Sequence, residues 1–246
     1  MNRIPKRLKK EPLIEAIWQV QFESHNAGEV LPGVLFTKLK KRHRALQLRR
    51  LPAADIPSPV AQIDPNLRYI TKVLTEEPEG AFLWQVGDRV VTLNCRKPYT
   101  GWKAFKEAIE SLVDDMKICG LVPQPQRHSL RYLDLLTLKP APDLSALRLK
   151  ITLGNHTIGQ HNLQMRLEVP TEDCIHVVQV VTPAHANLPE GTQTGTLVDL
   201  ETIARTEPED WENVLKQLDT LHTESKEIFF RHILKKETIQ KLEPEY

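Results

Sequence analysis

The stretch PLIEAIWQVQF (residues 12–22) alternates between apolar and polar side chains. Its apolar residues occupy every second position, at Ile14, Ala16, Trp18, Val20 and Phe22. Successive side chains of a β-strand point to opposite faces, so this pattern predicts a strand with one buried face. The polar residues between them are expected to face solvent.

Other β-rich runs follow along the chain. They lie at residues 67–75, 81–86, 89–94, 129–138, 146–153, 161–169, 174–182 and 195–203. Gly87-Asp88 separates two of these runs by two residues, which is typical of a tight hairpin. Proline and glycine indicate loops at 51–65 and 183–194.

Three segments are predicted to be helices; the last two have apolar spacings of three and four, which are typical of amphipathic helices, and the first has an imperfect period. They are residues 31–50, a helix from Thr100 to about Ile118 that ends at Gly120, and a long helix to about Lys236. Thr206 and Glu209 have the spacing of a capping box for the last one. Its second apolar set, Val214, Leu221 and Ile228, indicates either deep burial or a shared interface.

Runs of strands followed by helices are the pattern of an α+β protein. We predict two antiparallel sheets, each packed by a long helix. A basic flexible leader at 1–11 precedes an N-terminal half at 12–122 and a C-terminal half at 126–246, with prolines between the halves. The similar order of elements in the two halves is consistent with an old duplication.

Composition excludes several classes of protein. Of 246 residues, 40% are apolar and 26% are charged, so a packed core is expected. A net charge of +1 gives no global field that favours nucleic acid. The three cysteines, Cys95, Cys119 and Cys174, form no CxxC pair, so neither a disulfide framework nor a zinc site is expected. Without a secretory signal or an apolar run of about 20 residues, we predict a cytoplasmic protein with no membrane contact.

Three segments together resemble a known family. They are EPLIEAIWQVQF (11–22), SLRYLDLL (129–136) and LDTLHTESKEIFFRHILKKETIQKLEP (218–244), with TGWKAF (100–105) between the first two. In order and spacing they are similar to an uncharacterised family of prokaryotic proteins described as sporadically distributed. Asp134 departs from the family pattern, which has asparagine there. The resemblance implies no assigned activity, and sporadic occurrence implies an association with mobile or defence systems.

Two groups of polar residues are candidates for a site. Arg131, Tyr132 and Asp134 lie on one predicted strand, and Asp219 and His222 share a face of the last helix. A buried Asp134 would need a partner, for which an arginine is the natural choice. A carboxylate such as Asp219 can orient an imidazole for general base work. The sequence has no P-loop, GxGxxG, HExxH or GxSxG motif. We therefore expect these five residues to form a polar network that specifies the fold, with no catalytic residue, metal or cofactor.

A basic cluster could contact phosphates. It consists of Lys38, Lys40, Lys41, Arg42 and Arg44 on the first predicted helix, after a basic leader. Phosphate contacts release counterions, but no aromatic residues interleave for base stacking. A solvated helix face is the simpler interpretation of the cluster.

The sequence thus favours a non-enzymatic binding or regulatory protein that acts through a protein partner, or through a second copy of itself as a homodimer. One alternative is a nucleic-acid-binding module that uses the basic leader and first helix. Another is a hydrolase or nuclease whose site is assembled from distant polar residues.

Overall fold

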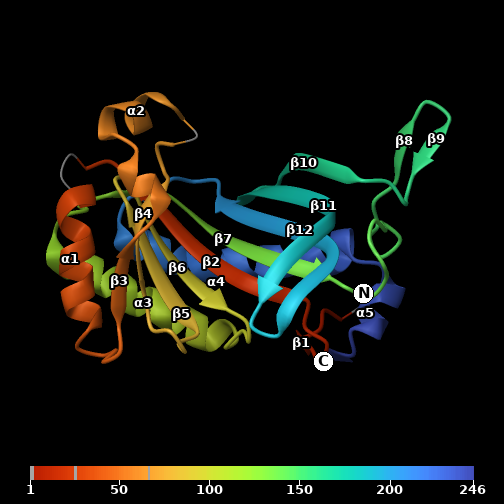
Figure 1. Cartoon of the computed structure of the whole chain (residues 1–246), viewed down its shortest axis with the longest axis horizontal. Helices are drawn as coiled ribbons and strands as arrows, with labels where there is room; N and C mark the ends of the chain where they lie inside the picture. The colour runs from red at the N-terminus through yellow and green to blue at the C-terminus, as the bar shows by residue number, and fades with distance from the viewer. Residues whose placement is uncertain (1–2, 25–26, 66) are drawn as a thin grey trace. The chain divides into compact units, whose positions relative to one another are not determined.

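The computed structural model describes residues 3–24, 27–65 and 67–246, and it combines helices with strands (Figure 1). The chain forms two compact units, each built from discontinuous segments. Unit 1 comprises Met1–Glu15, Arg131–Ile203 and Asp219–Tyr246. Unit 2 comprises Ala16–Leu130 and Ala204–Leu218. Each expected half, 12–122 or 126–246, is one continuous stretch of chain, whereas each observed unit combines segments from separate parts of the sequence.

Unit 2 is an antiparallel sheet with helices. Its strands follow the order β2 (Leu13–Phe22), β6 (Val90–Arg96), β5 (Phe82–Gly87), β4 (Thr71–Glu76) and β3 (Gln47–Arg50). Its helices are α1 (Ala27–Leu39), the 3-10 turn η1 (Pro52–Asp55), α2 (Ser58–Ile63) and α3 (Trp102–Cys119). Helix α3 contacts both α1 and β6.

The core of unit 2 follows the predicted periodicities. On β2, the alternate residues Ala16, Trp18, Val20 and Phe22 are all fully buried, which confirms the half-buried strand. On α3, the stripe of Phe105, Ile109, Leu112, Val113 and Met116 is buried. Gly120 ends this helix at φ 65°, a left-handed conformation that glycine adopts without strain.

Unit 1 contains a second group of strands. It includes β10 (Leu163–Pro170), β11 (Cys174–Leu188), β12 (Gly191–Ala204) and β7 (Pro125–Leu136), which neighbour one another in this order. Of β7, only residues 131–136 belong to unit 1, and its first residues, 125–130, belong to unit 2. Two short pairs are β1 (Arg7–Leu8) with β13 (Pro244–Glu245), and β8 (Ile151–Leu153) with β9 (His156–Ile158). Helix α4 (Trp211–Glu227) contributes residues to both units, and the π-helical turn η2 (Ile228–Ile233) and α5 (Lys236–Lys241) follow it.

The α+β class is confirmed. The expected division into two sheets is not confirmed, because nine strands follow one hydrogen-bonded order, β10-β11-β12-β7-β2-β6-β5-β4-β3. The predicted hairpin at Gly87-Asp88 is confirmed as β5 and β6, where Val86 faces Val91. The segment expected to be a flexible leader includes β1, because Leu8 packs into the core of unit 1.

Two helix predictions need correction at their ends. The helix expected over 31–50 is α1, which ends at Leu39, because 47–50 pair with β4 as strand β3. The long final helix ends at Glu227, and after η2 the backbone becomes extended at Leu234, which is fully buried and bridges to Leu147. In α4 the side chain of Asp210 accepts a hydrogen bond from the Asn213 N–H at 2.8 Å, so Asp210 caps this helix.

Two predicted loops contain regular structure. Residues 58–63 form α2, since prolines in a first helical turn need no hydrogen-bond donor. Most of 183–194 extends the hairpin of β11 and β12. The turn between these strands includes Gly191 at φ 116°.

The packing of α3 predicts that two isoleucines of this helix contribute very differently to the stability of the protein. Ile109→Ala should lower the free energy of unfolding by about 2–5 kcal/mol, because it leaves a cavity at a fully buried position. Ile118→Ala removes the same atoms where the side chain is 72% exposed, and should change it by less than about 0.5 kcal/mol. Urea denaturation followed by tryptophan fluorescence measures both variants. Equal losses would contradict the described packing of α3.

Candidate functional site

Arg131 pairs with an aspartate of a neighbouring strand in unit 1. Its Nε donates to Asp199 Oδ1 at 2.7 Å and its Nη2 to Asp199 Oδ2 at 2.5 Å. The hydrogen bond and charge of Asp199, with smaller contributions from Glu201 and Glu15, raise the pKa of Arg131 against the effect of burial. This two-point pair joins β7 to β12, and it gives Arg131 a partner other than the predicted Asp134.

Tyr132 and His222, two residues of the predicted polar network, lie in contact with each other. The Tyr132 hydroxyl lies 3.0 Å from Nδ1 of His222. Burial, and to a lesser extent the charge of Lys226, lowers the pKa of His222 to about 4. The charge of Asp219, which is exposed, raises the pKa of His222, but this effect is smaller than those of burial and of Lys226. His222 is therefore neutral at pH 7, and its Nδ1 faces a phenol.

Asp134 lies buried on the same strand, apart from these two pairs. Burial raises its pKa well above 3.8, and the nearby charge of Glu11 adds to the shift. Burial in this way favours the neutral form of the carboxyl group, which resembles an uncharged amide in shape and polarity. The predicted polar network is thus divided: Tyr132 contacts His222, Arg131 pairs with Asp199, and Asp134 belongs to neither pair.

The basic cluster lies in unit 2, at and after the end of α1. Lys38 is on the helix, and Lys40 lies 5.4 Å from the centre of the Phe36 ring. Arg42 forms a two-point ion pair with the buried Asp115, so it is a structural residue. Lys41 and Arg44 are exposed beyond the helix. Of the five predicted phosphate contacts, Lys40, Lys41 and Arg44 are thus exposed and have no ion-pair partner within the described residues, while Lys38 is half-buried.

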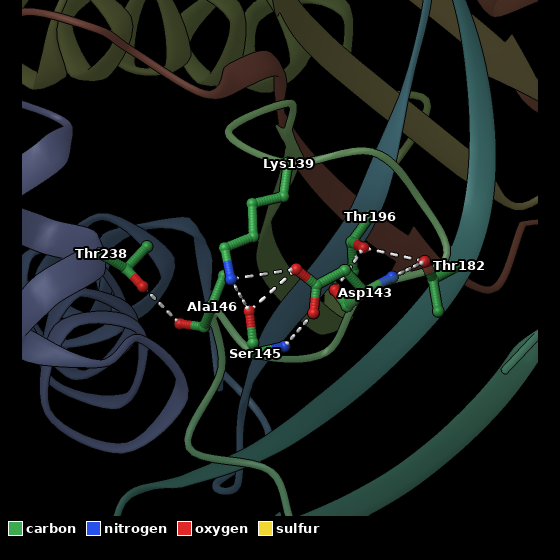
Figure 2. A network of polar contacts seen from close by, with 7 residues as sticks. All are labelled: Lys139, Asp143, Ser145, Ala146, Thr182, Thr196 and Thr238. Carbon is green, nitrogen blue, oxygen red and sulfur yellow. Dashed lines mark hydrogen bonds and ion pairs between the residues drawn. The ribbon is translucent and has the colours of Figure 1, made fainter. Parts of the chain in front are cut away.

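A polar network that the sequence did not indicate lies in the loop after β7, in unit 1. Figure 2 shows Lys139, Asp143 and Ser145 pointing toward one another. The Ser145 hydroxyl lies 2.8 Å from both Lys139 Nζ and Asp143 Oδ2. Thr196 Oγ1 donates to the Asp143 carbonyl at 3.0 Å, and Thr238 Oγ1 donates to the Ala146 carbonyl at 2.7 Å. The loop is thereby attached to β12 and α5.

The arrangement of Ser145 favours binding over hydrolysis. A nucleophilic serine needs a neighbouring base with a pKa near the working pH. Burial would raise the pKa of Asp143, but hydrogen bonds from Ser145 and the charge of Lys139 outweigh it, and the pKa is lowered. An acid that weakly holds protons is a poor general base. A cavity of about 270 Å³ adjoins the network and is also lined by Lys235 and Lys241.

A second group in unit 1 has the residue types of a catalytic triad. His176 Nδ1 lies 3.0 Å from Thr202 Oγ1, which lies 2.8 Å from Ser225 Oγ. Glu224 Oε2 is 3.8 Å from His176 Nε2. His176, Thr202 and Ser225 are at most 2% exposed, so a substrate has no route to them. The group stabilises the packing of α4 against β11 and β12.

Within residues 3–24, 27–65 and 67–246, no group of three or more His, Cys, Asp or Glu residues could hold a metal ion. Over the same ranges, no helix combines the length and apolarity that a membrane span needs.

Comparisons with protein-family models, with curated proteins and with solved structures give no significant match to this chain. The resemblance to the sporadically distributed family therefore remains a prediction, and the function is inferred from the geometry of the chain itself.

Burial of Asp134 predicts a pH effect. Its folded pKa is raised, so its contribution to stability is complete below about pH 3.8 and is lost as the pH rises through the folded pKa. Asp134→Asn keeps the shape without the ionisable proton and should make the protein more stable than wild type at pH 8. Urea unfolding at pH 5 and pH 8 measures the difference. A variant that is less stable at both values would show that Asp134 is a required ionic partner.

His222 predicts the opposite dependence. Its folded pKa of about 4 is below the unfolded value of 6.5, so its contribution to stability is complete above pH 6.5 and is lost as the pH falls toward 4. The loss amounts to at most about 3.5 kcal/mol. NMR titration should show the imidazole neutral until about pH 4, and His222→Gln should remove this part of the pH dependence. A measured pKa near 6.5 would contradict the described burial.

Proposed function

We propose that this chain is a non-enzymatic binding protein that acts through a protein partner, and that an acidic, extended segment of the partner pairs with β3. One observation carries the proposal. Strand β3 lies at the end of the strand order, pairs with β4 on one side, and has all four of its residues exposed. An exposed edge offers backbone donors and acceptors that a further strand can use.

Charge defines the partner that fits this edge. Lys41 and Arg44 lie just before β3, and within the described ranges neither has an ion-pair partner. In contrast, Arg49 and Arg50 of the strand are neutralised by Glu76 and Asp55. The surplus positive charge next to the edge favours an acidic segment by complementarity.

The same charges disfavour pairing of two copies through β3. Two identical basic edges would place like charges next to one another, which destabilises strand pairing. A homodimer, if formed, would need another surface. The partner that pairs with β3 is therefore a different protein and not a second copy of this chain.

Two further features support a protein over nucleic acid at this surface. Backbone groups of a strand edge pair with another strand, whereas nucleic acid contributes phosphates and bases. Leu48 is 42% exposed on β3, which favours an apolar contact from a peptide side chain. Nucleic acid remains the alternative for the basic cluster, and its signature is a steep fall of affinity with salt.

Affinity capture tests the proposed function. The tagged full-length chain is purified from its native host after nuclease treatment at moderate salt, and co-eluting proteins are quantified by mass spectrometry. Wild type should retain one protein near equal stoichiometry. Lys41→Glu/Arg44→Glu should reduce that protein at least tenfold by charge repulsion, and Leu48→Asp should also weaken it.

A matched control separates the site from net charge. Lys103→Glu/Arg127→Glu changes the charge of unit 2 by the same amount at other exposed positions, and should retain the partner. Loss of the partner from both double variants would contradict a site at β3. Capture of nucleic acid alone, with release as salt rises, would favour the alternative function. A chain that elutes alone would contradict both.

A further inference from the structure

A larger cavity, of about 810 Å³, lies within unit 1 beside η2 and α5. Its volume is in the range of natural small-molecule sites. The walls come from the start of the chain, the segment before β8, η2, α5 and the end of the chain. This cavity is separate from the proposed partner edge, which belongs to unit 2.

Cationic side chains dominate the polar lining of this cavity. They are Arg3, Arg148, Arg231 and Lys236. Arg231 forms an ion pair with Glu227 at 2.5 Å. Across the part of the chain that the structure describes, the other three have no ion-pair partner, and no carboxylate side chain lines the cavity. Three uncompensated cations around one space favour a ligand with more than one negative charge.

Arg148 is held in position before any ligand binds. Its backbone N–H donates to the Ile233 carbonyl, and its Nε donates to the Leu234 carbonyl, both at 2.8 Å. A guanidinium fixed through Nε keeps its terminal Nη donors for a ligand, and little side-chain entropy remains to be lost on binding. Phosphate oxygens match the fork of a guanidinium group.

The rest of the lining is apolar and partly aromatic. Phe230 is half-buried, Ile239 is buried, and Ile4 and Tyr246 complete this side of the cavity. Apolar walls gain little from a bare inorganic ion, but they favour a ligand with a ring that can pack on Phe230 or Tyr246. The cations and the apolar walls together select an amphipathic anion.

We propose that this cavity binds a small phosphate monoester that carries a ring system, of the nucleoside monophosphate type. The phosphate carries close to two negative charges and three acceptor oxygens at neutral pH, which fits Arg3, Arg148 and Lys236 better than a single carboxylate does. The ring occupies the apolar side, next to Phe230.

Calorimetric titration of the full chain with AMP, adenosine and inorganic phosphate tests this site. AMP should bind at least tenfold more tightly than either adenosine or inorganic phosphate, because only AMP uses both sides of the cavity. Phenyl phosphate, used as a fourth probe, distinguishes a general ring requirement from recognition of a nucleoside. Lys236→Gln and Arg148→Gln should each weaken AMP about tenfold or more.

Two controls keep the result interpretable. Lys241→Gln removes the same charge from α5 but lines the smaller cavity, so it should leave AMP affinity within twofold. Arg148 also anchors backbone, and therefore Lys236→Gln, an exposed position, provides the variant least able to affect folding. Absence of AMP binding, equal affinity for inorganic phosphate, or equal weakening by Lys241→Gln would each overturn the proposed site.

Discussion

Burial of one face of β2 is the constraint on which unit 2 depends. Ala16, Trp18, Val20 and Phe22 are all fully removed from solvent. At about 25 cal/mol per Å² of apolar surface, burying these side chains contributes on the order of 5–10 kcal/mol, as much as the net stability of a typical domain. A shift of the register by one residue would expose all four and bury the polar ones between them. The strands and helices around β2 must therefore supply apolar surface at fixed positions.

Such tight packing determines what the polar residues do. A buried polar group without a partner costs about 1–3 kcal/mol, and several interior polar groups have local partners. Asp199 holds Arg131, Thr202 joins His176 to Ser225, and Asp115 holds Arg42. These residue types would suit catalysis in an open cleft, but here they stabilise contacts between elements. The proposed binding therefore rests on side chains outside the interior.

Local patterns in the sequence determined much of the fold, and contacts between distant residues determined the rest. The alternation of 12–22, the hairpin at Gly87-Asp88 and the stripe of α3 depend on neighbours in the sequence, and all three were predictable. The end of α4 depends on Leu234, which is buried by its bridge to Leu147. Neither that bridge nor the partner of Arg131, which lies 68 residues away, leaves a periodic signal in the sequence.

Among the candidate site residues, too, those on regular elements could be predicted from the sequence, and those that depend on contacts between distant segments could not. His222 and Tyr132 could be named from the sequence because each stood on a recognisable element, although their contact joins residues 90 apart. The loop with Lys139 and Ser145, and the cavity beside α5, were not found, because their residues are scattered and individually ordinary. Asp134 lies between these cases: the family pattern has an asparagine at this position, and burial raises the pKa of this aspartate and so favours its uncharged form.

A net charge near zero conceals how the charges are distributed. The 33 lysines and arginines almost equal the 32 acids in number, yet many acids are used in ion pairs within the fold. Each ion pair uses a cation together with an acid, so the near-zero net charge does not indicate where the unpaired cations of the described residues lie. They gather beside β3 in unit 2 and around the cavity in unit 1, where geometry also offers a strand edge and an apolar wall. Positive charge alone is typical of a solvated face. A binding site is indicated where unpaired positive charge lies next to a strand edge or an apolar cavity wall.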